Sequence, residues 1–237
     1  MNDTPQISLA EMFNYQVFDD VYQQSSTLAH EVIAILAQAI ADRGSANMAV
    51  SGGSTPKVLF DILSNSVLDW EKVTVSLVDD RWLPCKHADS NQRLVENHLL
   101  QNQAVNAHFI PLYQSDMQLP QAIEQLNLKY SNKHQPFDIV LLGMGNDGHT
   151  ASLFPCSDQL RFGLSTTDRY LMTQPSTAPY LRVSLSADAI SRAKHLFLQL
   201  RGIDKQQTLQ SAVAGSEEMQ MPIRRFLTSN ITVLWCP

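Results

Sequence analysis

The sequence has little charge and no long hydrophobic run. Only 17% of its 237 residues are charged and 44% are apolar, which excludes a disordered tail, a coiled coil and a collagen-like chain. No apolar run approaches the roughly 18 to 20 residues that span a bilayer. The opening residues, MNDTPQISLAEMF, lack the basic and apolar regions of a secretory signal. We therefore expect a soluble, cytoplasmic protein.

Basic residues and cysteines are also scarce. The 17 Lys and Arg stand against 23 Asp and Glu, for a formal net charge of −6. This balance argues against a broad nucleic-acid-binding or membrane-binding face, although a local cluster of cations can still hold a small anion. Cys85, Cys156 and Cys236 are too widely spaced for a zinc-type ligand pair, and any disulfide would leave one thiol over. A reducing cytosol fits this pattern.

Predicted helices and strands alternate along the chain. Apolar residues recur at helical spacing from Leu28 to Arg43, and Gly44 follows as a stop signal. Further helices are expected at Ser90–Leu100, Pro120–Tyr130, Ala187–Ala193, Ile203–Val213 and Ile223–Leu227. Further strands are expected at Asn47–Val50, Val73–Val78, His108–Leu112, Phe137–Leu142, Tyr170–Thr173, Arg182–Leu185, His195–Leu200 and Ile231–Trp235. The alternation predicts one α/β domain over residues 1–237, with a mostly parallel sheet and ligands at the carboxyl ends of its strands.

Five of the nine glycines lie in two short loops, each after a predicted strand. The first loop, Ser51–Pro56 (SGGSTP), leads into a predicted helix for which Thr55 suits the N-cap and Pro56 the first position. Glycine backbone, two hydroxyls and a helix N-terminus make a phosphate cradle. No Gly-Lys-Ser/Thr follows, so the loop is not of the Walker type. An ordinary strand-to-helix turn is the alternative.

The second loop, Gly143–Thr150 (GMGNDGHT), formally matches the dinucleotide pattern G-x-G-x-x-G, and Asp168 has the spacing of a ribose-binding acid. Pro155 leaves too few residues for the helix that would receive a pyrophosphate, which counts against an NAD-dependent dehydrogenase. More informative is the pairing of Asp147 with His149. A carboxylate that orients an imidazole produces a general base near neutral pH, although a lone histidine is more often structural.

A third polar cluster, Asp79–Pro84 (DDRWLP), follows a predicted strand, with Ser90 and Asn91 at the next helix start. Two acids beside an arginine at the carboxyl end of a strand suit a polar ligand. A salt-bridged surface turn explains the same residues equally well.

Together these three segments resemble the 6-phosphogluconolactonase family, and the resemblance covers most of the chain. The specific part is Gly143–Pro155, and the similarity extends to Pro179–Leu185 and to Gly202–Lys205. The departures are Asp80 where the family usually has Glu, the bulky Trp82, and Cys156 in place of a common glycine.

The resemblance implies a modified Rossmann-like fold shared with glucosamine-6-phosphate deaminases, with helices on both faces of the sheet. It also implies hydrolysis of 6-phospho-D-glucono-1,5-lactone, the second step of the oxidative pentose phosphate pathway, with no organic cofactor and no metal. The expected partner is this sugar-phosphate lactone, with no nucleic acid or membrane, and the expected assembly is a monomer or weak homodimer.

The residues present can carry that reaction. His149, oriented by Asp147, would activate water, while the phosphate is held by the first glycine loop with Arg182 and Lys205. The expected substrate-binding residues are Gly52, Gly53, Ser54, Thr55, Asp79, Arg81, Gly145, Arg182 and Lys205.

Two further alternatives remain open on the sequence alone. An amino-sugar phosphate deaminase shares the glycine loops, but the resembling deaminase motif has a glutamate five residues after the histidine, where this chain has Phe154. A non-catalytic sugar-phosphate sensor would keep Arg182 and Lys205 without needing Asp147 or His149.

Overall fold

The computed structural model describes residues 9–131 and 135–237, and all structural statements refer to them. Their strands form a seven-stranded parallel sheet and a three-stranded antiparallel sheet. The order in the large sheet is β1 (Asn14–Val17), β10 (Ile231–Cys236), β9 (His195–Arg201), β6 (Ile139–Leu142), β2 (Ala46–Val50), β3 (Val73–Leu77) and β5 (His108–Phe109). The order in the small sheet is β4 (Asp79–Arg81), β8 (Arg182–Leu185) and β7 (Tyr170–Thr173).

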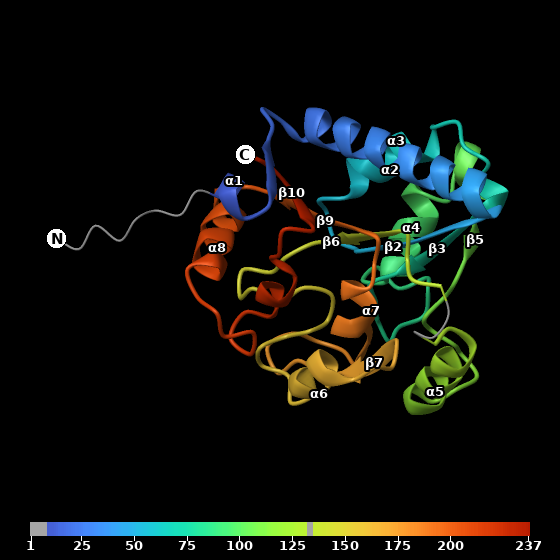
Figure 1. The fold of residues 1–237 in the computed structure, drawn as a ribbon. Coiled ribbons are helices and arrows are strands. Elements are labelled where there is room, and N and C mark those ends of the chain that lie inside the picture. The colour runs from blue at the N-terminus through green and yellow to red at the C-terminus, as the bar shows by residue number, and fades with distance from the viewer. Residues whose placement is uncertain (1–8, 132–134) are drawn as a thin grey trace.

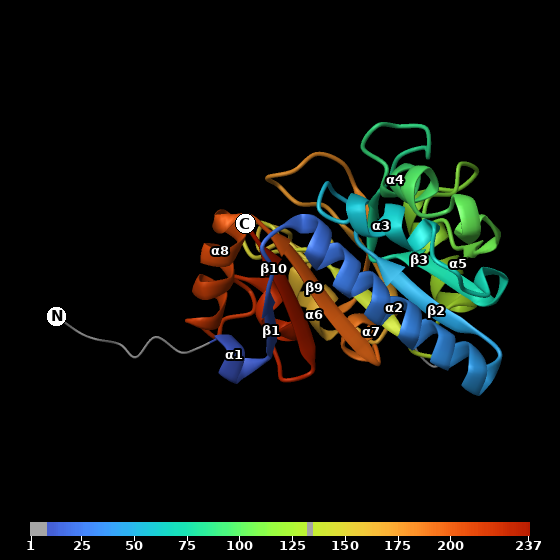
Figure 2. The same ribbon diagram turned by 90° about the horizontal axis from the view of Figure 1, so that it is seen from above.

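Helices cover both faces of the large sheet, as predicted. Figure 1 shows α2 and α3 above the sheet and α6, α7 and the small sheet below it, and Figure 2 shows α2 lying over the sheet, roughly along the direction of β9 and β2. The α-helices of the described residues are α1 (Leu9–Met12), α2 (Val21–Arg43), α3 (Lys57–Ser64), α4 (Asn91–His98), α5 (Leu119–Lys129), α6 (Leu160–Ser165), α7 (Ala187–Ser191) and α8 (Ile203–Val213). Three 3-10 turns are η1 (Trp70–Lys72), η2 (Asn102–Asn106) and η3 (Pro222–Phe226). No helix of these two ranges is long and apolar enough to cross a bilayer.

The small antiparallel sheet was not predicted, and it arises from a change of partner at Val78. The Val78 amide donates to Val50 of the large sheet at 2.9 Å, while its carbonyl accepts from Leu185 of β8 at 2.8 Å. The chain therefore leaves the large sheet after β3 and enters β4. As a result, Asp79 and Arg81 lie on a strand rather than in the loop that the sequence indicated.

The positions of the helix ends are set by local capping interactions, and the N-termini of two helices differ from the prediction. Helix α2 ends at Gly44 (φ 78°) as predicted, but it begins seven residues before Leu28 because the Asp20 carboxylate caps its first turn. The predicted Thr55 cap on α3 is wrong: Pro56 occupies the N-cap position, without any side-chain cap. The Thr55 hydroxyl is therefore not used by the helix.

The loops after β2 and β6 leave the same edge of the sheet, as predicted. These two strands pair directly, with Val50 opposite Leu141. All four residues of β6 are buried, which is the pattern of a central parallel strand covered on both faces. The pairing brings the two glycine loops together although they are about 90 residues apart in the sequence.

Candidate active site

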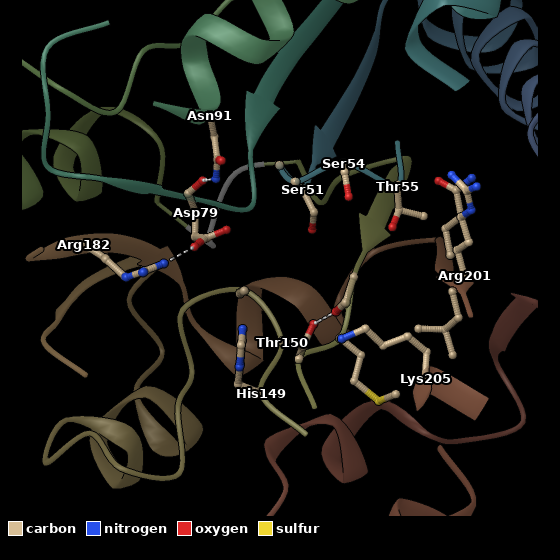
Figure 3. A pocket seen from close by; sticks show the side chains of 18 of the residues that line it. Ser51, Ser54, Thr55, Asp79, Asn91, His149, Thr150, Arg182, Arg201 and Lys205 are labelled. Atoms are coloured by element: carbon tan, nitrogen blue, oxygen red, sulfur yellow. Dashed lines mark hydrogen bonds and ion pairs between the residues drawn. The ribbon is translucent and has the colours of Figure 1, made fainter. Parts of the chain in front are cut away.

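A cavity of about 280 Å³ lies at the carboxyl ends of β2, β6 and β9 (Figure 3). Every predicted site residue lines it except Asp147, which lies behind His149. The other lining residues are Ser51, Asn91, Gly143, Met144, Thr150, Ala151, Gln199, Leu200 and Arg201. The carboxyl edge of the parallel sheet is thus the place where the predicted residues meet.

The first glycine loop is fixed at its base and polar at its tip. Ser51 donates to the Leu141 carbonyl through both its amide, at 3.1 Å, and its hydroxyl, at 2.9 Å. Gly52 passes so close to Asn91 that a β-carbon would overlap the Asn91 amide. The hydroxyls of Ser54 and Thr55 form no hydrogen bond within the described residues, and both residues line the cavity.

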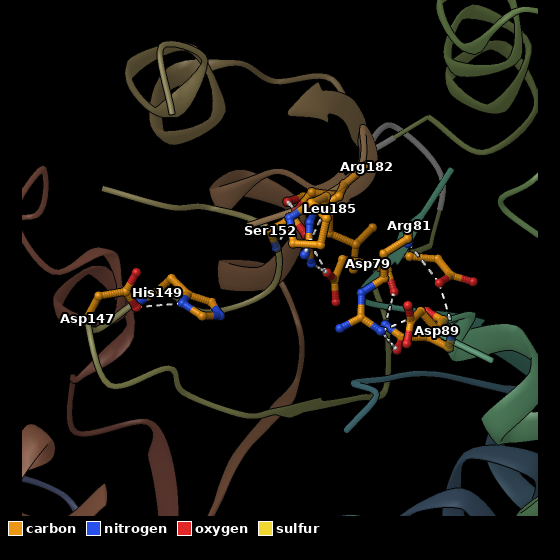
Figure 4. Close-up of polar contacts among 12 residues, drawn as sticks. Asp79, Arg81, Asp89, Asp147, His149, Ser152, Arg182 and Leu185 are labelled. Atoms are coloured by element: carbon orange, nitrogen blue, oxygen red, sulfur yellow. Dashed lines mark hydrogen bonds and ion pairs between the residues drawn. The ribbon is translucent and has the colours of Figure 1, made fainter. Parts of the chain in front are cut away.

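The second glycine loop presents His149 to the same cavity. Its Nδ1 lies 2.5 Å from Oδ1 of Asp147, which also accepts from the His149 amide at 3.1 Å (Figure 4). Gly145 passes against the imidazole so closely that a β-carbon there would overlap the ring, so only glycine fits. The Thr150 hydroxyl closes the loop by donating to the Gly143 carbonyl at 2.8 Å.

The Asp147–His149 pair remains accessible to solvent. The Asp147 side chain is 39% exposed and the His149 side chain 29%. Partial burial raises the pKa of Asp147, but the hydrogen bonds and charge of His149 outweigh it, so the pKa lies below its usual value. Asp147 therefore stays ionised at neutral pH and holds Nδ1, which leaves Nε2 as the free ring nitrogen.

Asp79 also has a basic partner, Arg182, and this second pair is buried. The side chains of Arg182 and Asp79 are 7% and 9% exposed, and the closest oxygen and nitrogen are 3.8 Å apart. The Ser152 hydroxyl donates to the same Asp79 oxygen. Burial lowers the pKa of Arg182, and the charge of Asp79 offsets part of this effect. The buried Arg182 Nε finds no hydrogen-bond partner among the described residues.

Lys205 and Arg201 lie on the other side of the cavity from Arg182 (Figure 3). The Lys205 ammonium donates to Asn146, which belongs to the same loop as His149. Among the residues that the structure describes, four cationic side chains (Arg81, Arg182, Arg201 and Lys205) and one carboxylate (Asp79) line the cavity. The cavity is thus locally positive in a protein whose net charge is −6.

The sequence analysis missed Arg201 and Gln199, which line the cavity from the end of β9. A usable signal existed, because residues at the carboxyl end of any central parallel strand are candidates for the site.

Asp80, next to Asp79, does not line the cavity. Its carboxylate accepts from the amides of Asn91 at 2.7 Å and Gln92 at 3.0 Å, at the start of α4. Burial raises its pKa to about 6, although these backbone hydrogen bonds act in the opposite direction. The two adjacent acids thus have separate tasks: Asp79 pairs with a cation, and Asp80 holds a helix end.

The fold and the cavity define an α/β protein whose cation-lined cavity, beside an acid and histidine pair, suits a small anionic ligand. The chain belongs to the family of glucosamine-6-phosphate isomerases and 6-phosphogluconolactonases, whose model matches residues 19–235.

Individual relatives agree with this assignment. A 6-phosphogluconolactonase of Pseudomonas aeruginosa is 41% identical over 224 residues, which are 94% of each chain. A crystal structure of a 6-phosphogluconolactonase from Shewanella baltica has a TM-score of 0.89 and 39% identity, covering 95% of this chain and 98% of that one. A monomeric glucosamine-6-phosphate deaminase, 16% identical, has a TM-score of 0.77 and covers 94% and 97% of the two chains, which shows the shared fold alone.

Proposed function

We propose that the protein hydrolyses 6-phospho-D-glucono-1,5-lactone to 6-phospho-D-gluconate. The observation that carries this proposal is the solvent-accessible His149, held by Asp147, on the wall of a cation-lined cavity. The names of relatives near 40% identity support the same substrate.

The phosphate would bind at the first glycine loop. The free hydroxyls of Ser54 and Thr55 and the N-terminus of α3 suit a dianion. Lys205 would add positive charge from one wall and Arg182 from the other, with Arg201 as a third cation. Binding energy from the phosphate is thereby used to place the lactone carbonyl near His149.

His149 would act first as a base and then as an acid. Nε2 takes a proton from water, and the water oxygen attacks the lactone carbonyl carbon to form a tetrahedral oxyanion. Backbone amides of the 143–148 loop or a nearby guanidinium would stabilise that oxyanion. The bond from the carbonyl carbon to the ring oxygen then breaks, and the imidazolium returns its proton to that oxygen. Asp147 keeps its charge throughout and stabilises the imidazolium.

The rival reaction, deamination of an amino-sugar phosphate, needs an additional acid to open the ring. At the position of that acid this chain has Phe154, which is 4% exposed and stacked on the His149 ring. A phenyl ring cannot transfer a proton, so this contact favours lactone hydrolysis.

A pH-stat assay with freshly generated lactone, corrected for spontaneous hydrolysis, tests the proposal. We expect acid release well above the spontaneous rate, saturable in lactone and inhibited by 6-phosphogluconate. Ammonia release from glucosamine 6-phosphate at an enzyme-like rate, without lactone hydrolysis, would contradict it.

A further inference from the structure

One buried aromatic ring contacts both the proposed base and a proposed binding cation. The centroid of the Phe154 ring lies 3.8 Å from that of His149, with 23° between the planes. The guanidinium carbon of Arg182 lies 5.1 Å from the same Phe154 centroid. Phe154 is 4% exposed and does not line the cavity, so its effect on a ligand is indirect, and these two neighbours link it to the cavity wall.

His149 needs a second constraint besides Asp147. The hydrogen bond between Nδ1 and the carboxylate fixes one corner of the imidazole, but the ring can still tilt about the axis of that bond. A flat surface stacked at 3.8 Å opposes such a tilt. The stacked ring thus sets the direction in which Nε2 points, and that direction decides whether Nε2 meets an attacking water.

Arg182 is also weakly held by its polar partners. Its contact with Asp79 is 3.8 Å long, and its hydrogen bond to the Pro179 carbonyl is 3.4 Å long. Its Nε has no partner in the part of the chain that the structure describes. The face of the Phe154 ring therefore contributes to holding the guanidinium in place.

We propose that Phe154 is a positioning residue that sets the orientation of His149 and its spacing from Arg182. The kinetic part of this inference rests on the proposed lactone hydrolysis. One rigid ring in contact with both groups couples the direction of the base to the location of the cation. Loss of the ring therefore affects turnover and substrate binding together.

The test compares Phe154→Leu with a matched control, Phe137→Leu. Phe137 is 3% exposed and its ring lies 4.6 Å from the guanidinium carbon of Arg169, so it shares the burial and the cation contact of Phe154. It does not line the cavity, and its ring stacks on no histidine within the described residues. Both variants should lower Tm by a similar amount. We expect Phe154→Leu to lower kcat about 10-fold and to raise KM a few-fold, with Phe137→Leu within about twofold of wild type.

A spectroscopic measurement reports the stack without relying on activity. Ring current from Phe154 shifts the NMR signals of the His149 ring protons, which are assigned by their absence in His149→Ala. Phe154→Leu should move these signals toward those of a free imidazole, whereas Phe154→Tyr and Phe137→Leu should leave them in place. Phe154→Tyr, which keeps the flat face, should also retain most of the turnover. If Phe154→Leu does not fold, Phe154→Met takes its place with the same expectations.

The outcomes separate this inference from the proposed function. Kinetic constants for Phe154→Leu that match those of Phe137→Leu would overturn the positioning role, as would unchanged His149 signals. A wild-type protein without lactone hydrolysis would overturn the proposed function alone. The positioning role would then be decided by the NMR signals and by 6-phosphogluconate affinity, which Phe154→Leu should weaken and Phe137→Leu should not.

Discussion

Two acid-containing pairs, Asp147 with His149 and Asp79 with Arg182, lie beside the same cavity, and they differ in spacing and in exposure (Figure 4). Asp147 and His149 are two residues apart, 2.5 Å from each other, and 39% and 29% exposed. Asp79 and Arg182 come from paired antiparallel strands, are 3.8 Å apart, and are 9% and 7% exposed. The first pair is accessible to water, whereas the second is largely buried and reaches only the wall of the cavity.

The difference in exposure between the two pairs indicates that they have different functional roles. A proton can move between water and Nε2 of His149 because solvent reaches the imidazole. Arg182 keeps its proton at every ordinary pH. The Asp79 carboxylate pairs with Arg182 and accepts a hydrogen bond from the Ser152 hydroxyl. The exposed pair is therefore suited to proton transfer and the buried pair to a fixed charge that holds a ligand.

The largest expected effect is on the exposed pair. His149→Ala removes the proposed base, so we predict that kcat falls by about 10²- to 10⁴-fold. The affinity for 6-phosphogluconate should stay within about threefold, because the cations and the first glycine loop remain. Stopped-flow or pH-stat kinetics measure the first quantity and calorimetry the second. Wild-type turnover in His149→Ala would contradict the assignment of proton transfer to the exposed pair.

A smaller effect, mainly on substrate binding and less on turnover, is predicted when the cations are replaced. Arg182→Ala and Lys205→Ala should each raise KM about 10- to 100-fold through loss of a charged hydrogen bond, with a lesser effect on kcat.

Thermal unfolding then distinguishes the two cation variants. Arg182→Ala leaves the buried Asp79 carboxylate without its cation and should lower Tm by several degrees. Lys205 is only partly buried and its partner Asn146 is neutral and exposed, so Lys205→Ala should leave Tm nearly unchanged. Equal Tm values for both variants would show that burial of the Asp79–Arg182 pair has no energetic consequence.

Much of the fold was predictable because its signals are local. The strand at Arg182–Leu185 and the helix at Ile203–Val213 agree with the prediction to the residue. The separate antiparallel sheet was not predictable, since it depends on Val78 exchanging hydrogen bonds with two strands distant in the sequence. Likewise β1 (Asn14–Val17) is short and half exposed, and it gains its strand conformation by pairing with β10.

The site was predictable for a related reason. The sequence alone marks the 143–150 loop, because the loop combines glycines with an acid and histidine pair. The close approach of Gly145 to His149 explains why glycine is needed there. The contribution of Arg201 depends on β9 lying beside β6, which only the strand order reveals. The stacking of Phe154 on His149 depends on how the loop folds in three dimensions. The spacing of the two residues in the sequence does not indicate this contact.

The last prediction concerns stability and not activity, and it involves Asp80, which lies next to Asp79 but belongs to neither pair. Its pKa in the folded protein is raised to about 6 from an ordinary value of 3.8. A raised carboxyl pKa means that the folded state binds this proton more tightly than the unfolded state does. The contribution of Asp80 to stability is therefore greatest below pH 4 and is lost as the pH rises through 6, by about 3 kcal/mol at most.

Asp80→Asn removes this titration while keeping an oxygen that can accept from the start of α4. Urea unfolding of wild type and variant at pH 4, 5, 6 and 7 measures the difference. We expect the wild type to lose stability relative to the variant between pH 4 and 6, with little further change above pH 7. Parallel stability curves would mean that the four hydrogen bonds donated to the Asp80 carboxylate fully offset its burial. In that case burial alone would not explain why the buried acids Asp79 and Asp80 differ in role from the exposed Asp147. The hydrogen bonds donated to each carboxylate would have to explain the difference.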